Sequence, residues 1–158
     1  MSSRKLLIIA HAPSPNTQAM TKAILAGAQN EDIDNVEARL VSPFQCHAPD
    51  VLSADALILY TTENFAYMSG ALKDFFERIY YPCLEQEKRN EAKPYALVIR
   101  AGLDGTGTDL AVHKIINGLK WREVQKTTLC KGDYDPIFED RCKELGMTIA
   151  ASLDNDLY

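Results

Sequence analysis

The sequence lacks any apolar run approaching the roughly 20 residues that span a bilayer, and its basic residues form no patch. With 17 Lys and Arg against 22 Asp and Glu, the net charge of −5 argues against duplex nucleic acid or an anionic membrane surface as a partner. The four cysteines are far apart, with no CxxC motif and no Cys/His pair at metal spacing. We therefore expect reduced thiols in or near the core, not a disulfide framework or a metal site.

The start of the chain has two basic residues before a short apolar stretch, a pattern that also begins secretion signals. Here the apolar stretch covers only residues 5–10 and is followed at once by His11 and two prolines, Pro13 and Pro15. This is too short for a signal sequence, and we predict a first strand instead. The expected location is the cytoplasm.

The 158 residues are 46% hydrophobic and 25% charged, which is close to the globular average. No linker, repeat or low-complexity segment divides them. We therefore expect a single domain covering residues 1–158.

Short apolar runs alternate with stretches of helical periodicity. One such stretch places Leu72, Phe75, Phe76 and Ile79 at positions i, i+3, i+4 and i+7. Strands are predicted at 5–10, 36–41, 56–60, 95–99 and 123–130, and helices at 17–28, from about 69 to a stop at Pro82, around 112–119, and from about 135 onward. The alternating polarity of 36–41 predicts an edge strand. This order indicates an α/β fold with a parallel sheet and helices on both faces.

Ligands of such sheets bind beyond the carboxyl ends of the strands. That rule selects the first loop (residues 11–17), the second loop (61–70) and the third loop (100–108). These are also the loops with the least ordinary composition.

The first loop joins a buried strand to a helix amino terminus, where free N–H groups and the helix dipole favour an anion. Ser14, Asn16 and Thr17 add side-chain donors suited to a phosphate. The same residues also suit plain helix capping. Because the loop has neither a Walker lysine nor a GxGxxG motif, binding of nucleoside triphosphates and the usual mode of dinucleotide binding are disfavoured.

The second loop is long for its type and carries Phe65 and Tyr67, which need a surface to pack on. A planar heterocycle, a neighbouring subunit and the adjacent helix are all candidates. The third loop contains Gly102, Gly105 and Gly107, which permit close approach of backbone to a ligand or simply a turn.

The run FAYMSGALKDFFER, residues 65–78, resembles a motif of the flavodoxin-like superfamily, and within it the NAD(P)H-dependent FMN and quinone reductases. Asn16-Thr17 is similar to the end of that family's phosphate loop, and Gly102 with Gly105 to its third loop. The resemblance covers nearly the whole chain in element order. It implies a three-layer sandwich with a five-stranded parallel sheet in the order 2-1-3-4-5.

The resemblance implies FMN as the cofactor. Its phosphate would be held by Ser14, Asn16 and Thr17, with His11 nearby at the strand end. Backbone contacts to its ring would come from Thr62, Glu63, Asn64, Phe65, Ala101, Gly102 and Gly105, and Tyr134 could shield it. Two residues depart from expectation: Pro15 stands where the family has glycine and removes an N–H, and the Glu63 carboxylate would disfavour an anionic reduced ring.

The function expected from this resemblance is an FMN-dependent oxidoreductase that passes electrons from NAD(P)H to a quinone or similar small acceptor. Such chemistry needs no protein nucleophile. A homodimer or higher homo-oligomer is expected, with the helix near Ser69 packed against a second subunit. One alternative is a flavodoxin-type electron carrier, which Glu63, Asp104 and Asp109 would serve as an acidic patch. The other is a flavin-free binding protein of the same fold.

Overall fold

The computed structural model describes residues 2–158. Its strands are β1 (Arg4–Ala10), β2 (Val36–Val41), β3 (Ala56–Thr62), β4 (Pro94–Ala101), β5 (Arg122–Glu123) and β6 (Thr128–Lys131). Its longer helices are α1 (Pro15–Ala28), α3 (Gly70–Leu84), α5 (Thr106–Leu119) and α6 (Ile137–Asp154), and the short ones are η1 (Pro43–Gln45), α2 (Ala48–Ser53) and α4 (Glu87–Asn90). Within these residues, no helix has the length and apolarity to cross a bilayer.

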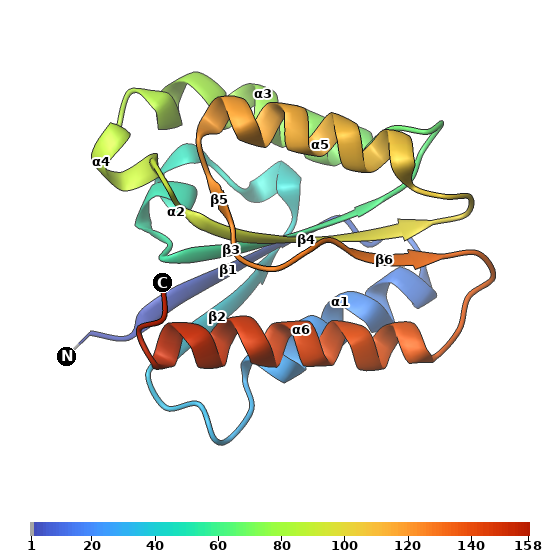
Figure 1. Cartoon of the computed structure of the whole chain (residues 1–158), viewed down its shortest axis with the longest axis horizontal. Coiled ribbons are helices and arrows are strands. Elements are labelled where there is room, and N and C mark those ends of the chain that lie inside the picture. The colour runs from blue at the N-terminus through green and yellow to red at the C-terminus, as the bar shows by residue number, and fades with distance from the viewer. Residues whose placement is uncertain (1) are drawn as a thin grey trace.

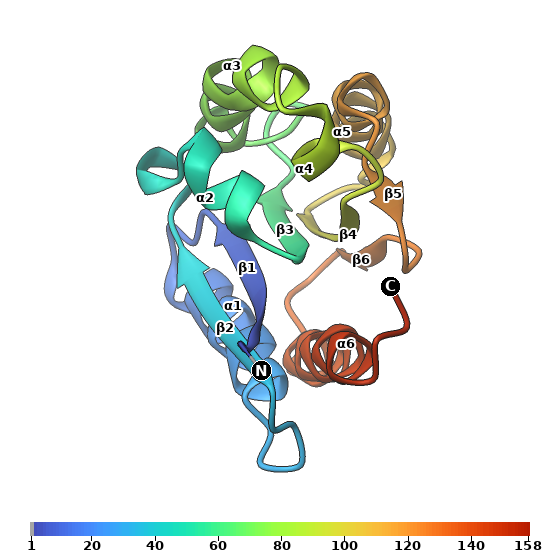
Figure 2. The ribbon, with the colours of Figure 1, turned by 90° about the vertical axis from the view of Figure 1, so that its left-hand side faces the viewer.

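The sheet is parallel throughout, in the order β2-β1-β3-β4-β5, with β6 also paired to β4. Helices α1 and α6 cover one face and α3 and α5 the other, so three layers result (Figures 1 and 2). The predicted fold class, strand order 2-1-3-4-5 and edge position of residues 36–41 are confirmed.

Each strand of the sheet's centre sends alternate side chains into two separate cores. In β1, Leu7 and Ile9 pack under α3 and α5, whereas Leu6 and Ile8 pack under α1 and α6. Because both faces are buried, the central strands are continuous apolar runs, as is usual in parallel sheets. All four cysteines are free and buried in these cores.

The predicted fifth strand, residues 123–130, is broken. The chain pairs with β4 at Arg122–Glu123, leaves the sheet, and pairs with β4 again from Thr128. In the gap, the Thr127 hydroxyl donates to Asp109 Oδ1 of α5 at 2.9 Å. A tertiary contact thus replaces the ladder at this point.

Two predicted helix boundaries are wrong. Helix α1 begins at Pro15 with Ser14 as its cap, two residues before the predicted start at Thr17, because proline is well suited to the first helical position. Helix α3 continues past Pro82 to Leu84. Pro82 is exposed and lies in the last turn, so its missing N–H costs a single bond of the helical ladder.

Candidate functional site at the carboxyl edge of the sheet

Strands β1, β3 and β4 are adjacent and parallel, so the three loops that follow them leave the same edge of the sheet. This edge lies on the right in Figure 1. All the residues predicted to bind the cofactor are in these loops or at the adjoining ends of β3, β4, α1 and α5. The fold thus brings together segments that are about 90 residues apart in the chain.

Glu63 joins the second loop to the third. Its carboxylate accepts hydrogen bonds from Leu103 N–H at 2.9 Å and from Gly105 N–H at 2.8 Å, one on each oxygen. The Glu63 N–H donates to Arg100 O at 2.9 Å, so backbone and side chain both hold the loops together. The negative charge of Glu63, which the sequence places beside a ligand ring, is therefore stabilised by two backbone amides of the third loop.

The tip of the second loop is a two-residue reversal. Asn64 and Tyr67 exchange backbone hydrogen bonds of 2.8 and 2.9 Å, and Phe65 and Ala66 between them have φ angles of 52° and 59°. Positive φ at both central positions costs non-glycine residues about 1–2 kcal/mol each. The turn displays Phe65 with 103% relative exposure, so an aromatic ring stands free at the site's edge.

The first turn of helix α5 packs against this reversal. A β-carbon at Gly107 would lie 2.2 Å from Ala66 O, so only glycine lets the loop approach the helix this closely. The buried hydroxyl of Thr108 donates to Tyr67 O at 2.9 Å. The strained tip is held in place by contacts that do not depend on a ligand.

The third loop ends at Gly105, which precedes α5 with a φ of 71°. This left-handed conformation turns the chain into the helix, and its N–H points to Glu63. Asp104 Oδ1 accepts from Thr106 N–H at 3.1 Å within the same turn.

The first loop, by contrast, closes on itself. Thr17 N–H donates to Ser14 Oγ at 3.2 Å, and Ser14 N–H donates to Thr17 Oγ1 at 3.0 Å, which is a complete capping box. The Thr17 hydroxyl also donates to Ser14 O at 3.0 Å. The plain capping role of these residues is thus present. His11 lies at the strand end, and the centres of its ring and the Phe44 ring are 6.0 Å apart in an edge-to-face arrangement.

Tyr134 packs against its own chain. Its hydroxyl donates to Glu139 Oε2 at 2.6 Å, and its ring contacts Phe138 edge-on at 5.8 Å between centres. The Arg100 guanidinium lies over both rings, 5.9 Å from the Tyr134 centre.

The thiols of the protein are poor nucleophiles. Burial raises the pKa of Cys46 and of Cys142 to about 12 and that of Cys83 to about 11, and it also raises the pKa of Cys130. These groups are protonated at neutral pH and serve as core packing. Residues 2–158 contain no cluster of His, Cys, Asp and Glu suited to a metal ion.

One polar cluster at α5 was not anticipated from the sequence. His113 Nε2 lies 2.6 Å from Glu123 Oε2, and Nδ1 lies 2.9 Å from Asp109 O and 3.2 Å from Asp109 Oδ1. Burial lowers the pKa of His113, but these hydrogen bonds and the two carboxylate charges outweigh burial and raise it above 6.5. The i, i+4 spacing of Asp109 and His113 was the available sequence clue.

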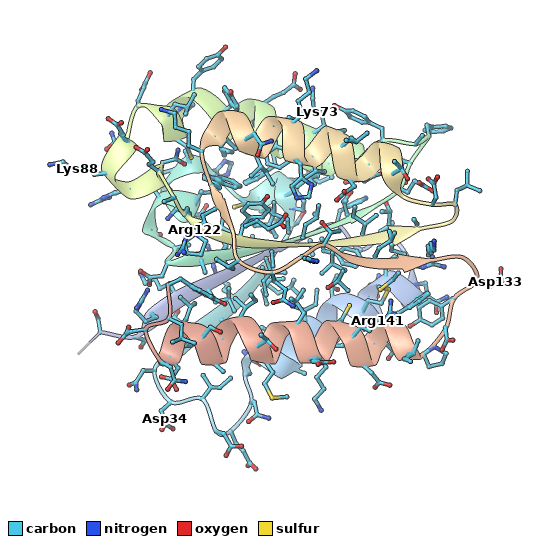
Figure 3. All side chains as sticks on the ribbon, viewed as in Figure 1. Asp34, Lys73, Lys88, Arg122, Asp133 and Arg141 are labelled. Atoms are coloured by element: carbon cyan, nitrogen blue, oxygen red, sulfur yellow. The ribbon has the colours of Figure 1, made fainter. Side chains whose placement is uncertain are left out.

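A groove of about 530 Å³ runs between α3 and α5 on the outer face, lined by Lys73, Phe76, Tyr80 and Tyr81 among others. Lys73 marks this face in Figure 3. An adjoining hollow of about 440 Å³ continues along α5 past Leu110 to Tyr67, beside the second loop. Tyr81 and Leu110 are largely exposed, so an apolar surface extends from the groove to the site.

No known family model matches the sequence, and no curated protein sequence matches it. Solved structures do match. A flavodoxin from the domain Archaea has 18% identity and a TM-score of 0.74, with 94% of this chain and 98% of that chain covered. A flavodoxin, WrbA-like protein from Agrobacterium tumefaciens has 14% identity and a TM-score of 0.74, covering 98% and 99%.

An NADH:FMN oxidoreductase in its apo form has 13% identity and a TM-score of 0.71, with 95% of this chain and 90% of that chain covered. At these identities the likeness concerns the fold. The chain has a flavodoxin-like fold over nearly its whole length.

Proposed function

We propose that the protein is an FMN-binding oxidoreductase that passes electrons from NAD(P)H to a quinone or similar small acceptor. The observation that carries this proposal is the Glu63 bridge, which holds the second and third loops together at the carboxyl edge of the sheet. Structures of the same fold include proteins named as flavodoxins and as an NADH:FMN oxidoreductase. The edge is where parallel α/β sheets bind their ligands.

The ring of such a cofactor would lie against the second and third loops, using groups other than the Leu103 and Gly105 N–H, which donate to Glu63. Thr62 to Phe65 would line one side and Ala101 to Gly105 the other, and Glu63 fixes the distance between them. The exposed Phe65 ring would cover the ligand and exclude water. At the other end, Ser14, Asn16 and Thr17 would meet the phosphate with a small donor set, because the capping box already uses part of it.

FMN would supply the electron-transfer chemistry when bound, and the chain would bind, orient and shield it. This division agrees with the buried, protonated cysteines. NAD(P)H and the acceptor would use the same exposed edge in turn, in a cytoplasmic setting. A second copy packed on the groove between α3 and α5 would form a homodimer or higher oligomer, with the partner close to Tyr67.

An electron carrier is less well supported. The acidic patch that would dock its partner consists of Glu63, Asp104 and Asp109. Glu63 and Asp104 accept backbone hydrogen bonds in the third loop, and Asp109 is engaged by Thr127 and His113. These carboxylates are committed to the protein itself and offer little free charge for docking.

Titration of the flavin-free protein with FMN tests the proposal, using quenching of flavin fluorescence for binding and NAD(P)H absorbance for turnover. We expect saturable binding of FMN. When a quinone is added, we also expect oxidation of NADH or NADPH that requires both FMN and the protein. Free FMN without protein is the control. Protein that ignores excess FMN would overturn the proposal and favour a flavin-free binding protein; binding without turnover would favour a carrier.

A further inference from the structure

We infer that the site recognises the flavin ring and gains little from the phosphate, so that it takes riboflavin and FMN with similar affinity. The inference rests on the proposed function and narrows it to a class of ligand, flavins with or without a phosphate. Its basis is the donor inventory of the first loop and the charge around it.

The backbone of residues 12–17 has few N–H groups left for an anion. Pro13 and Pro15 have none. Those of Ser14 and Thr17 donate to each other's side chains in the capping box. Only the amides of Ala12 and Asn16 meet no acceptor within residues 2–158.

Of the three side chains suited to a phosphate, Asn16 is exposed, Ser14 Oγ lies 2.9 Å from Thr17 Oγ1, and Thr17 is already committed. The Thr17 residue is buried, and its hydroxyl donates to Ser14 O, so a phosphate would have to displace an existing bond to use it. The same holds for Thr17 N–H, which already has the Ser14 oxygen as partner. An exchanged hydrogen bond contributes much less than a new one.

Cations are also missing. The three loops contain one Lys or Arg, which is Arg100. Its guanidinium donates to Ala101 O and Cys130 O and lies over the rings of Tyr134 and Phe138. No Lys or Arg occurs between Lys5 and Lys22, and the chain has a net charge of −5. A dianionic phosphate would find the α1 dipole, two backbone amides and the side chains of Ser14 and Asn16 here, but no Lys or Arg from the three loops that is free to pair with it.

The ring side is built differently. The second and third loops are joined by Glu63, supported by Thr108 and close-packed over Gly107. Phe65 stands exposed at its edge. Binding free energy would therefore come from the ring, which riboflavin and FMN share.

The test measures dissociation constants of lumiflavin, riboflavin and FMN by fluorescence quenching, and compares wild type with Pro15→Ala and Pro15→Gly. Both substitutions restore one N–H at the first position of α1. For wild type we expect FMN and riboflavin affinities within about threefold of each other. Pro15→Ala and Pro15→Gly should each raise FMN affinity by about 10-fold and leave riboflavin affinity unchanged, since one charge-assisted hydrogen bond is gained.

Pro82→Ala is the matched control, because it restores an N–H at an exposed proline of α3 and should change neither affinity. A circular dichroism melt of each variant checks that it is folded. Wild-type preference for FMN of 30-fold or more would overturn the inference while the proposed function stands. Failure of all three flavins to bind would instead overturn the proposed function. Equal gains for riboflavin and FMN in the Pro15 variants would also overturn the inference, because the added N–H would then not act on the phosphate.

Discussion

The first loop and the pair formed by the second and third loops lie at the same edge of one sheet but are stabilised in different ways. The first loop is stabilised within four residues, through the capping box that pairs Ser14 with Thr17. The second and third loops depend on each other, since the Glu63 carboxylate crosses some 40 residues of sequence to reach Leu103 and Gly105. A locally capped loop folds with its helix, whereas a bridged pair forms only when the whole edge is assembled.

This difference indicates which loops determine ligand specificity. Polar groups that are already paired have little left to offer a ligand. The bridged pair keeps an exposed aromatic ring and a fixed separation between two backbone segments, which are the features that orient a flat ligand. The comparison predicts that changes to the bridge affect ligand binding most, and that changes to the capping box affect mainly stability.

The largest effect is expected for Glu63→Ala. Loss of both acceptors leaves Leu103 and Gly105 N–H without partners and frees the third loop, so FMN and lumiflavin affinities should fall together by about 10- to 100-fold. Glu63→Gln retains one acceptor oxygen and should lie between. Fluorescence titration gives the affinities, and amide hydrogen exchange at Leu103 and Gly105 reports loop order in the flavin-free protein.

Glu77→Gln is the control for that experiment, since this exposed carboxylate on α3 pairs with Lys73 and lies outside the three loops. Unchanged exchange at Leu103 and Gly105 in Glu63→Ala would show that the bridge does not order the loop.

The next largest effect is expected for Gly107→Ala. The added β-carbon would lie 2.2 Å from Ala66 O, a backbone atom, so the second loop must move away from α5. We expect a loss of about 1–3 kcal/mol in the free energy of unfolding, measured with urea. Gly102→Ala is the matched control because a β-carbon there meets nothing within 4 Å. Equal stability of the two variants would mean that the second loop is not packed on the helix.

Ser14→Ala tests the other side of the comparison. Removing the cap leaves Thr17 N–H without its partner, and the free energy of unfolding should fall by about 1 kcal/mol. Ser53→Ala makes the same chemical change at the end of α2, where no cap is lost, and serves as the control. A fall in FMN affinity of 10-fold or more with riboflavin unaffected would show that Ser14 holds the phosphate tightly and would contradict the inference that the phosphate adds little to binding.

The smallest effect concerns His113, which anchors the helix that carries the third loop. Its pKa is raised in the folded state above 6.5, so the imidazolium stabilises the fold. That contribution is complete below pH 6.5 and disappears as the pH rises through the folded-state pKa. The free energy of unfolding of wild type should exceed that of His113→Gln by about 0.5–1 kcal/mol at pH 5.5, and by less at pH 8.5.

Urea unfolding at several pH values measures this difference, with His47→Gln as the control. A wild-type advantage that grew with pH would reverse the assigned sign.

The elements that could be predicted from sequence are those fixed by local pattern. The apolar runs predicted β1, β3 and β4. The alternation of strands and helices predicted a parallel sheet, and with it the position of the three loops at one edge. What escaped depends on contacts between distant segments. The sequence contains Glu63 but not the direction of its carboxylate, which the third loop determines. The gap between β5 and β6 follows from Thr127 reaching Asp109, and the His113 cluster joins α5 to β5.

The helix boundaries escaped for a different reason. Pro15 favours a helix start and Pro82 disfavours continuation, but each rule acts by position within a turn. Asn16 and Thr17 were plausible caps, and Ser14 was chosen by the reciprocal bond with Thr17. The approximate position of α1 was therefore predictable, whereas the groups left free at its start were not.

The broken strand at the sheet's margin also bears on how molecules of this protein meet each other at high concentration. A long, flat margin with unpaired amides and carbonyls can recruit a strand from another molecule and begin aggregation. Here β5 has two residues and β6 four, and the guanidinium of Arg141 on α6, which is labelled in Figure 3, donates to Leu129 O of β6 at 3.1 Å. The opposite margin, β2, carries Glu37 and Arg39 on its outward positions. The β5–β6 margin therefore offers no long uninterrupted template for intermolecular pairing, and the charges on β2 disfavour pairing at the other margin.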